Sequence, residues 1–112
     1  MTPPEPAAGF GLVVRFRLRP GHEEAFDVLV AATIEGIRAH EPGTLVYASH
    51  QVDGDPGARI FYELYRDRTA FEEHERQPHT RHFLVEREQH LAGLAVDILQ
   101  LVAGGQQPQS IV

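Results

Sequence analysis

The regular pattern in the chain begins with an alternation of apolar and polar residues over 12–18, which predicts a half-buried β-strand. The apolar side of this strand comprises Leu12, Val14, Phe16 and Leu18. After a Pro-Gly turn, apolar residues recur at every third or fourth position up to Ile37, as they do along the buried face of an α-helix. Glutamates at 23 and 24 favour the first turn of this helix, and a second Pro-Gly pair predicts that it ends near His40.

A hairpin is predicted in the middle of the chain. Two runs rich in β-branched and aromatic residues, 44–52 and 59–66, are separated by the turn-forming residues 53–57. Residues 94–102 are also largely apolar or alternating, and predict a last strand.

Two helices are expected between the hairpin and the last strand. Asp67 is suited to cap a short helix that carries its apolar side chains and His74 on one side, and Pro78 should interrupt that helix. A second helix is predicted over 79–92, with Gly93 as the residue that follows its end.

The resulting order of elements is β-α-β-β-α-β, the ferredoxin-like arrangement, in which helices cover one face of an antiparallel sheet. The predicted fold class is therefore α+β. A length of 112 residues suffices for one domain with one core. We expect this domain to span 10–103, between flexible tails at 1–9 and 104–112 that lack a periodic apolar pattern.

Charge and composition exclude several classes of partner. Acidic residues outnumber basic ones by 16 to 10, every basic residue is arginine, and the net charge is −6. Since nucleic-acid-binding proteins normally carry a basic surface, no nucleic acid is expected as a partner. The absence of cysteine excludes disulfides and thiolate metal sites. Apolar runs are too short for a membrane span, so a cytoplasmic location is expected by default.

The face of the sheet that the helices leave bare is predicted to form a homodimer. If the apolar side of the first strand faces the helices, we expect the opposite face to carry Val13, Arg15, Arg17, Phe61, Glu63, Tyr65, Asp97, Leu99 and Leu101. Such a face is too apolar for open solvent, and ion pairs could set its register with a second copy. The predicted interface charges are Arg15, Arg17, Glu63 and Asp97. The alternative is an exposed amphipathic sheet with solvated salt bridges.

Four stretches of sequence carry a resemblance to a known family. They are VVRFRLRPGHEEAF (13–26), EPGTLVY (41–47), IFYELYRDRTAFEEH (60–74) and PHTRHF (78–83). In these stretches the chain resembles the antibiotic biosynthesis monooxygenase (ABM) domain, a dimeric α/β-barrel group. The resemblance implies a homodimer, with a pocket in each subunit between the helices and the sheet. Its members include cofactor-independent oxygenases of aromatic polyketides and quinols, haem-degrading enzymes, isomerases and proteins without an assigned activity.

The chain departs from the haem-degrading members of that family. Those members surround the haem with Asn, Trp and His, and this sequence contains neither Asn nor Trp. Tyr65 stands where the family often has Trp at the end of the third strand. His74 and His82 remain candidate axial ligands, but haem degradation is disfavoured.

Histidines are numerous, and three of the seven lie close together at His74, His79 and His82. The last two are three residues apart and could share a helix face, which makes a metal site conceivable. No fourth ligand is evident, and the resemblance implies catalysis without a metal. A structural role around the Pro78 break is therefore preferred, and no metal or other cofactor is predicted.

Candidate catalytic residues are those expected to face the helix-covered side of the sheet. Oxygenation of a phenol without a cofactor requires a base that removes a proton, donors that hold the anion, and exclusion of water. Either His50 or His74 could act as the base, and Tyr62 could donate a hydrogen bond. Phe71 and Phe83 are expected to line the pocket. Register could reverse the face that any strand residue occupies, and Tyr62 could equally be an ordinary core tyrosine.

The leading functional hypothesis is a cofactor-independent monooxygenase that acts on an aromatic or quinol-like small molecule. One alternative is a non-redox enzyme, such as an isomerase, on the same scaffold. Another is an accessory protein that binds a ligand without transforming it.

Overall fold

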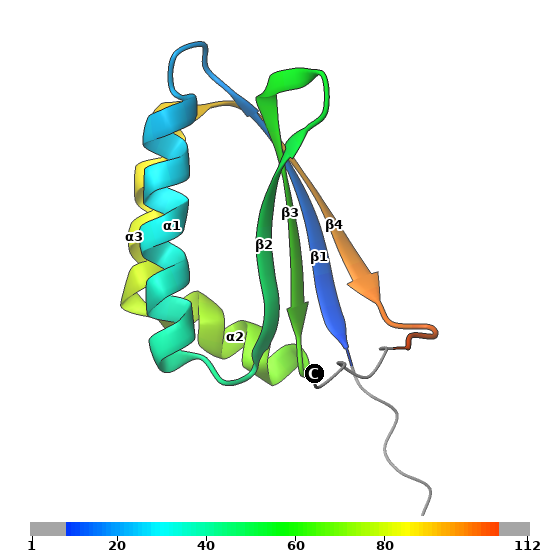
Figure 1. Cartoon of the computed structure of the whole chain (residues 1–112). Coiled ribbons are helices and arrows are strands. Elements are labelled where there is room, and N and C mark those ends of the chain that lie inside the picture. The colour runs from blue at the N-terminus through cyan, green and yellow to red at the C-terminus, as the bar shows by residue number, and fades with distance from the viewer. Residues whose placement is uncertain (1–8, 106–112) are drawn as a thin grey trace, which may run out of the picture.

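The computed structural model describes residues 9–105 and confirms the α+β fold. Its elements are β1 (Phe10–Leu18), α1 (Glu23–His40), β2 (Thr44–Val52), β3 (Asp55–Tyr65), α2 (Arg68–Arg76), α3 (Pro78–Glu86), the 3₁₀-helix η1 (Arg87–His90) and β4 (Leu91–Gln100). All strand pairs are antiparallel, in the order β2-β3-β1-β4. The helices cover one face of the sheet and leave the other bare (Figure 1). Most of the two predicted tails, residues 1–8 and 106–112, lies outside the described residues.

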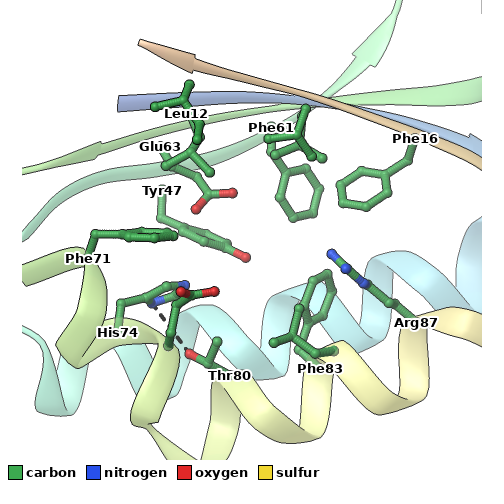
Figure 2. A pocket seen from close by; sticks show the side chains of 15 residues that line it. Leu12, Phe16, Tyr47, Phe61, Glu63, Phe71, His74, Thr80, Phe83 and Arg87 are labelled. Carbon is green, nitrogen blue, oxygen red and sulfur yellow. Dashed lines mark hydrogen bonds between the residues drawn. The ribbon is translucent and has the colours of Figure 1, made fainter. Parts of the chain in front are cut away.

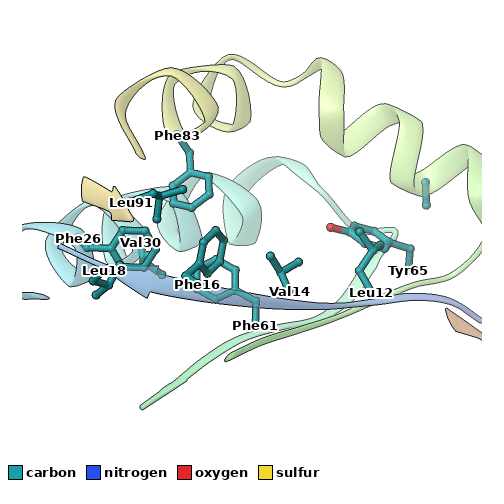
Figure 3. Packing of buried hydrophobic residues seen from close by; sticks show 11 residues of the cluster. Leu12, Val14, Phe16, Leu18, Phe26, Val30, Phe61, Tyr65, Phe83 and Leu91 are labelled. Atoms are coloured by element: carbon teal, nitrogen blue, oxygen red, sulfur yellow. The ribbon is translucent and has the colours of Figure 1, made fainter. Parts of the chain in front are cut away.

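The core lies between the sheet and the helices, and aromatic rings fill it. Phe16 and Phe61 point from the sheet, while Phe26 and Phe83 approach from α1 and α3 (Figure 3). The rings of Phe16 and Phe61 meet edge to face at 4.6 Å between centroids. Such pairs add to the stabilisation that burial of the rings already supplies.

The helix boundaries follow local signals in the sequence. α1 ends at His40, as predicted, and Glu41 follows it as the capping residue. The Asp67 carboxylate accepts a hydrogen bond from the backbone N–H of Ala70 at 2.8 Å, which starts α2. Gln77 separates α2 from α3, and Pro78 occupies the first turn of α3, where no backbone N–H is needed.

Two predicted boundaries were wrong. The helix expected over 79–92 ends at Glu86, and Gly93 lies inside β4, paired with Arg17 of β1. The apolar pattern from Leu91 onward therefore extends the strand instead of ending a helix. The hairpin turn is also shorter than predicted, because Val52 pairs directly with Asp55 and Gly54 takes a positive φ of 78°.

The predicted face of β3 was also wrong. Glu63 pairs with Leu12, and Phe61 pairs with Val14. Because directly paired residues share a face of the sheet, these β3 residues and Tyr65 point toward the helices and are buried. A one-residue change in register turns a whole strand over, and both sides of β3 are apolar enough that the pattern alone could not choose.

On the bare face, three of the four predicted interface charges are present. Arg15, Arg17 and Asp97 lie there, whereas Glu63 is on the helix side. The carboxylate that the arginines contact is Asp55, which accepts two hydrogen bonds from Arg17 at 2.8 and 2.7 Å. Within residues 9–105, no helix is both long enough and apolar enough to cross a membrane.

Candidate active site

A cavity of about 260 Å³ lies between the sheet and the helices α2 and α3. Apolar side chains make up most of its wall: Leu12, Val14, Phe16, Tyr47, Phe61, Phe71, Phe83, Leu84, Val96 and Ile98. The other lining residues are Glu63, His74, Glu75, Thr80 and Arg87. Figure 2 shows Glu63 and Phe61 pointing down from the sheet, with His74, Thr80 and Phe83 facing them from the helices. A flat aromatic molecule would meet ring surfaces on several sides and a few polar groups at defined points.

His74 is fixed in this wall by a carboxylate behind it. Its Nδ1 atom lies 2.6 Å from Oε1 of Glu41, and both side chains are almost wholly buried. Glu41 comes from the loop after α1, where Gly43 allows the chain to approach Ala70 of α2: a Cβ atom at Gly43 would lie 2.7 Å from that side chain. The two helices and the loop therefore hold the imidazole ring in one orientation.

Glu41 is held in its ionised form by hydrogen bonds. Burial alone would raise the pKa of Glu41, but donation from His74, His79 and Thr44 outweighs burial, and the pKa lies below its ordinary value. An ionised carboxylate only accepts hydrogen bonds, so Nδ1 of His74 carries the proton between them. The other ring nitrogen, Nε2, is left to accept a proton from a molecule in the cavity.

A second carboxyl group, Glu63, lies in the cavity wall in a different environment. Burial raises the pKa of Glu63 above its ordinary value, although the Tyr65 hydroxyl donates a hydrogen bond to Oε1 at 2.5 Å. Burial and the Glu63 charge also raise the pKa of Tyr65, so this phenol remains a donor. The cavity thus contains a carboxyl group that gains a proton more readily than an exposed glutamate.

Arg87 supplies a cation at the other end of the cavity. Its guanidinium lies 5.8 Å from the ring centroids of both Phe16 and Phe83. Within the part of the chain that the structure describes, its buried Nε atom has no hydrogen-bond partner, and the nearest carboxylate oxygen, from Glu88, is 3.8 Å away. Figure 2 shows the side chain pointing from the helix end toward the centre of the cavity. A guanidinium in this position can attract an anion.

The residues predicted for the pocket separate into two groups. His74, Phe71 and Phe83 line the cavity. His50 and Tyr62 do not, because they lie on the bare face of the sheet, where His50 pairs with Ile60 and Tyr62 pairs with Val13. Their predicted face was wrong for the same reason as that of Glu63: alternation within β2 and β3 does not fix which side is covered.

Sequence reasoning missed three residues that shape the cavity: Glu41, Glu63 and Arg87. Glu41 follows a helix immediately before Pro-Gly, a position where an exposed acidic residue is ordinary. The spacing of Glu41 and His74, 33 residues apart, carries no local signal of contact. Arg87 was placed inside a long helix that in fact ends before it.

The three histidines considered as metal ligands do not converge. His74 and His79 both direct a ring nitrogen at Glu41, whereas His82 is exposed on α3. Within residues 9–105, no group of three His, Cys, Asp or Glu side chains is arranged to hold a metal ion.

Comparison with known proteins identifies the family. The model of the family described as "Antibiotic biosynthesis monooxygenase" matches residues 9–85, which include β1 through most of α3. The chain belongs to the antibiotic biosynthesis monooxygenase family. The resemblance noted in the sequence is thereby confirmed, and the matched segment contains Glu41, Glu63 and His74 but ends before Arg87.

Several solved structures share the fold of this chain. The PA3566 protein from Pseudomonas aeruginosa is 29% identical, over 86% of this chain and 96% of that one, with a TM-score of 0.77. The Rv0793 protein from Mycobacterium tuberculosis is 27% identical over 88% and 100% of the two chains, with a TM-score of 0.80. A Caulobacter crescentus protein provisionally assigned as an antibiotic biosynthesis monooxygenase shares the fold, at 21% identity over 87% and 92% of the chains and a TM-score of 0.81. No curated protein sequence matches this chain.

Proposed function

We propose that this member of the antibiotic biosynthesis monooxygenase family oxidises a phenolic or quinol-like aromatic molecule with O₂, without a metal or organic cofactor. The observation that carries the proposal is the buried His74–Glu41 pair in the wall of an aromatic cavity. A histidine whose Nδ1 is tied to a carboxylate keeps Nε2 as a base, and the carboxylate stabilises the imidazolium that forms.

The first step is removal of a proton from the substrate hydroxyl by Nε2 of His74. The resulting phenolate is electron-rich enough to react with O₂ directly. For a substrate with a CH₂ group conjugated to the phenolate, as in an anthrone, insertion of one oxygen atom gives a carbonyl group. The second oxygen atom leaves as water with a net two hydrogens from the CH₂ group, and the proton held by His74 returns to the product phenolate, so the substrate itself supplies all four electrons.

Arg87 and Glu63 support the later charges in this scheme. The Arg87 guanidinium lies over two aromatic walls and can stabilise the phenolate or a peroxide anion formed from O₂. Glu63 has a pKa raised by burial, and can return a proton to the departing oxygen. In this scheme His74 takes up a proton on one side of the cavity, and Glu63 donates a proton from the other side.

The bare face of the sheet is proposed as the surface of a homodimer in the cytoplasm. It exposes apolar side chains such as Tyr62, which is 37% exposed, beside Arg15, Arg17 and Asp97. A second copy would cover the apolar residues and could exchange ion pairs with these charges. Sedimentation as a monomer at micromolar concentration would remove this part of the proposal.

The function is tested by O₂ consumption with a panel of hydroquinones and anthrones, with no flavin or metal added. We expect one O₂ consumed for each anthrone carbon oxidised, and a loss of about 10²-fold to 10⁴-fold in His74→Gln, the range for loss of a general base. His82→Gln is the matched control, because His82 is an exposed histidine on the neighbouring helix. Turnover that persists without O₂ would indicate an isomerase, and binding without turnover would indicate an accessory protein. Either result overturns the proposal.

A further inference from the structure

Glu41 contacts two histidines whose rings line two different cavities. Its Oε1 faces Nδ1 of His74 at 2.6 Å, and its Oε2 faces Nε2 of His79. His74 lines the aromatic cavity. His79 lines a separate hollow with Gly36, His40, Gln77 and Pro78, and its side chain remains 16% exposed. One buried carboxylate therefore stands between a ring in the cavity and a ring at the surface.

The position of His79 is built into α1. A Cβ atom at Gly36 would lie 2.5 Å from Cγ and 2.7 Å from Nδ1 of the His79 ring. These distances are too short for any residue other than glycine at this position. Glycine is a poor helix former, so its presence in the middle of α1 is explained by the room that it leaves for the ring. The ring of His40, one turn further along α1, stacks near that of His79, at 6.2 Å between ring centroids.

The single negative charge of Glu41 cannot balance two positive charges if both histidines are imidazolium ions. Glu41 is ionised and accepts an N–H from each ring, so each ring has one further nitrogen that can gain or lose a proton. Those atoms are Nε2 of His74 and Nδ1 of His79. A single carboxylate compensates one positive charge, and a second positive charge in the same buried cluster would lack a counterion.

We propose that Glu41 couples His74 and His79 into one titrating unit, in which a proton taken up by His74 in the cavity is matched by a proton released from His79 to solvent. This inference rests on the proposed role of His74 as the base. The steps balance, because one N–H bond forms at Nε2 of His74 and one breaks at Nδ1 of His79, with water as the acceptor. His79 is thus a positioning residue: it gives up its own positive charge when His74 gains one, so the cluster around Glu41 holds one positive charge at a time.

Other groups around the two rings are weaker counterions than Glu41. Tyr47 and Tyr65 pack against His74, and the pKa of each is raised, which keeps them neutral. Glu63 faces His74 from β3 with a raised pKa, Thr80 lies 3.4 Å from Nδ1, and Arg87 adds positive charge. Glu75 lies on the same helix and also lines the cavity, but it is exposed, and solvent screens its charge. On the other side, His40 faces His79, and Arg38 lines a hollow beside Glu41.

The test is a pH titration of the histidine rings by long-range ¹H–¹⁵N NMR, which needs no substrate. We expect Nδ1–H on His74 and Nε2–H on His79, and two titration steps that are each visible at both rings. In His79→Gln, which keeps an N–H for Glu41 but cannot titrate, His74 should titrate in one step with proton affinity raised about tenfold or more. His82→Gln should leave both steps unchanged. Independent single-step titrations of His74 and His79 in the wild-type protein would overturn the inference.

A second variant distinguishes coupling from simple support of the fold. Gly36→Ala leaves every titratable group in place but forces the His79 ring away from α1. We expect the titration of His74 to become a single step, as in His79→Gln, while the rest of the spectrum keeps its dispersion. Retention of two shared steps in this variant, with the His79 ring shown to be displaced, would contradict the coupling. Failure of the O₂ assay alone would overturn the proposed function without affecting the NMR result.

Discussion

Glu41 and Glu63 are both buried glutamates, one behind His74 and the other in the wall of the same cavity, yet their environments shift their pKa values in opposite directions. Their exposed fractions are similar, 8% and 6%. Three donors surround Glu41 and lower its pKa, whereas Glu63 receives a hydrogen bond from Tyr65 and has its pKa raised by burial. Burial by itself therefore does not decide the protonation state of a carboxyl group in this protein. The number and kind of donors decide it.

This difference assigns different tasks to the two groups. An ionised carboxylate behind His74 orients the ring and stabilises its charged form, and so favours a base. A carboxyl group that holds its proton more firmly, inside the cavity, favours an acid. The pair matches the division of labour expected where two carboxyl groups of one site have displaced pKa values.

The largest expected effect comes from removing each carboxyl group in turn. Glu41→Ala leaves Thr44 and two histidines without their shared acceptor, and should cost about 3 to 5 kcal/mol of unfolding free energy. Glu63→Ala leaves one hydroxyl, that of Tyr65, without its acceptor, and should cost about 1 to 3 kcal/mol. Urea unfolding at neutral pH measures both. Equal losses would show that the two sites are not energetically different.

The second prediction concerns the pH dependence of stability. The pKa of Glu41 is lower in the folded protein, so its contribution is present above the pKa of the unfolded state and is lost as pH falls through the folded value. The pKa of Glu63 is higher in the folded protein, so its contribution is complete below the unfolded pKa and is lost as pH rises through the folded value. Glu41→Gln should flatten the acid side of the stability curve. Glu63→Gln should flatten the stability curve at higher pH, over the range in which the folded-state Glu63 loses its proton.

At neutral pH the same two amide variants should change the unfolding free energy by different amounts, or in opposite directions. Glu63→Gln keeps an acceptor for Tyr65 and removes the cost of a buried charge, so its stability should change by less than about 1 kcal/mol or rise. Glu41→Gln replaces charge-assisted hydrogen bonds by neutral ones and should lose about 2 kcal/mol. Thermal unfolding at several pH values provides the curves. Parallel curves for the two variants would contradict the opposite pKa shifts.

Arg87 tests whether the cavity recognises an anion. Arg87→Gln should weaken binding of a phenolate-type ligand by about tenfold to 100-fold, since a hydrogen bond to a charged group contributes about 1.5 to 3 kcal/mol. Stability should fall by about 1 kcal/mol or less, because in the described residues the Nε atom has no hydrogen-bond partner and only the contacts with Phe16 and Phe83 are lost. Calorimetric titration with a naphthol above and below its own pKa measures the effect. A loss that is equal for the neutral and anionic ligand would point to packing against Phe16 and Phe83 instead.

The smallest effects are expected on the bare face of the sheet. His50→Ala and Tyr62→Phe change side chains that do not line the cavity, and should alter turnover less than twofold and stability by less than about 0.5 kcal/mol. Steady-state O₂ uptake beside His74→Gln checks this. A large loss of turnover in either variant would show that the bare face contributes to the active site.

The fold could be predicted from the sequence because its signals are local. The alternation of β1, the period of α1, the Asp67 cap and the break before Pro78 all depend on neighbours a few residues apart. The site could be predicted only in part: His74, Phe71 and Phe83 lie on helices, whose 3.6-residue period specifies a face. Strand residues such as Tyr62 and Glu63 depend on register, and the Glu41–His74 contact depends on how a loop packs across the helix layer.

The most direct test of this account is ¹³C NMR of the glutamate side-chain carboxyl groups as the pH is varied. We expect the Glu41 signal to stay at the ionised position to a pH below the ordinary range for glutamate, and the Glu63 signal to reach the protonated position at a pH above that range. Titration of both signals together in the ordinary range, or in the reverse order, would contradict it.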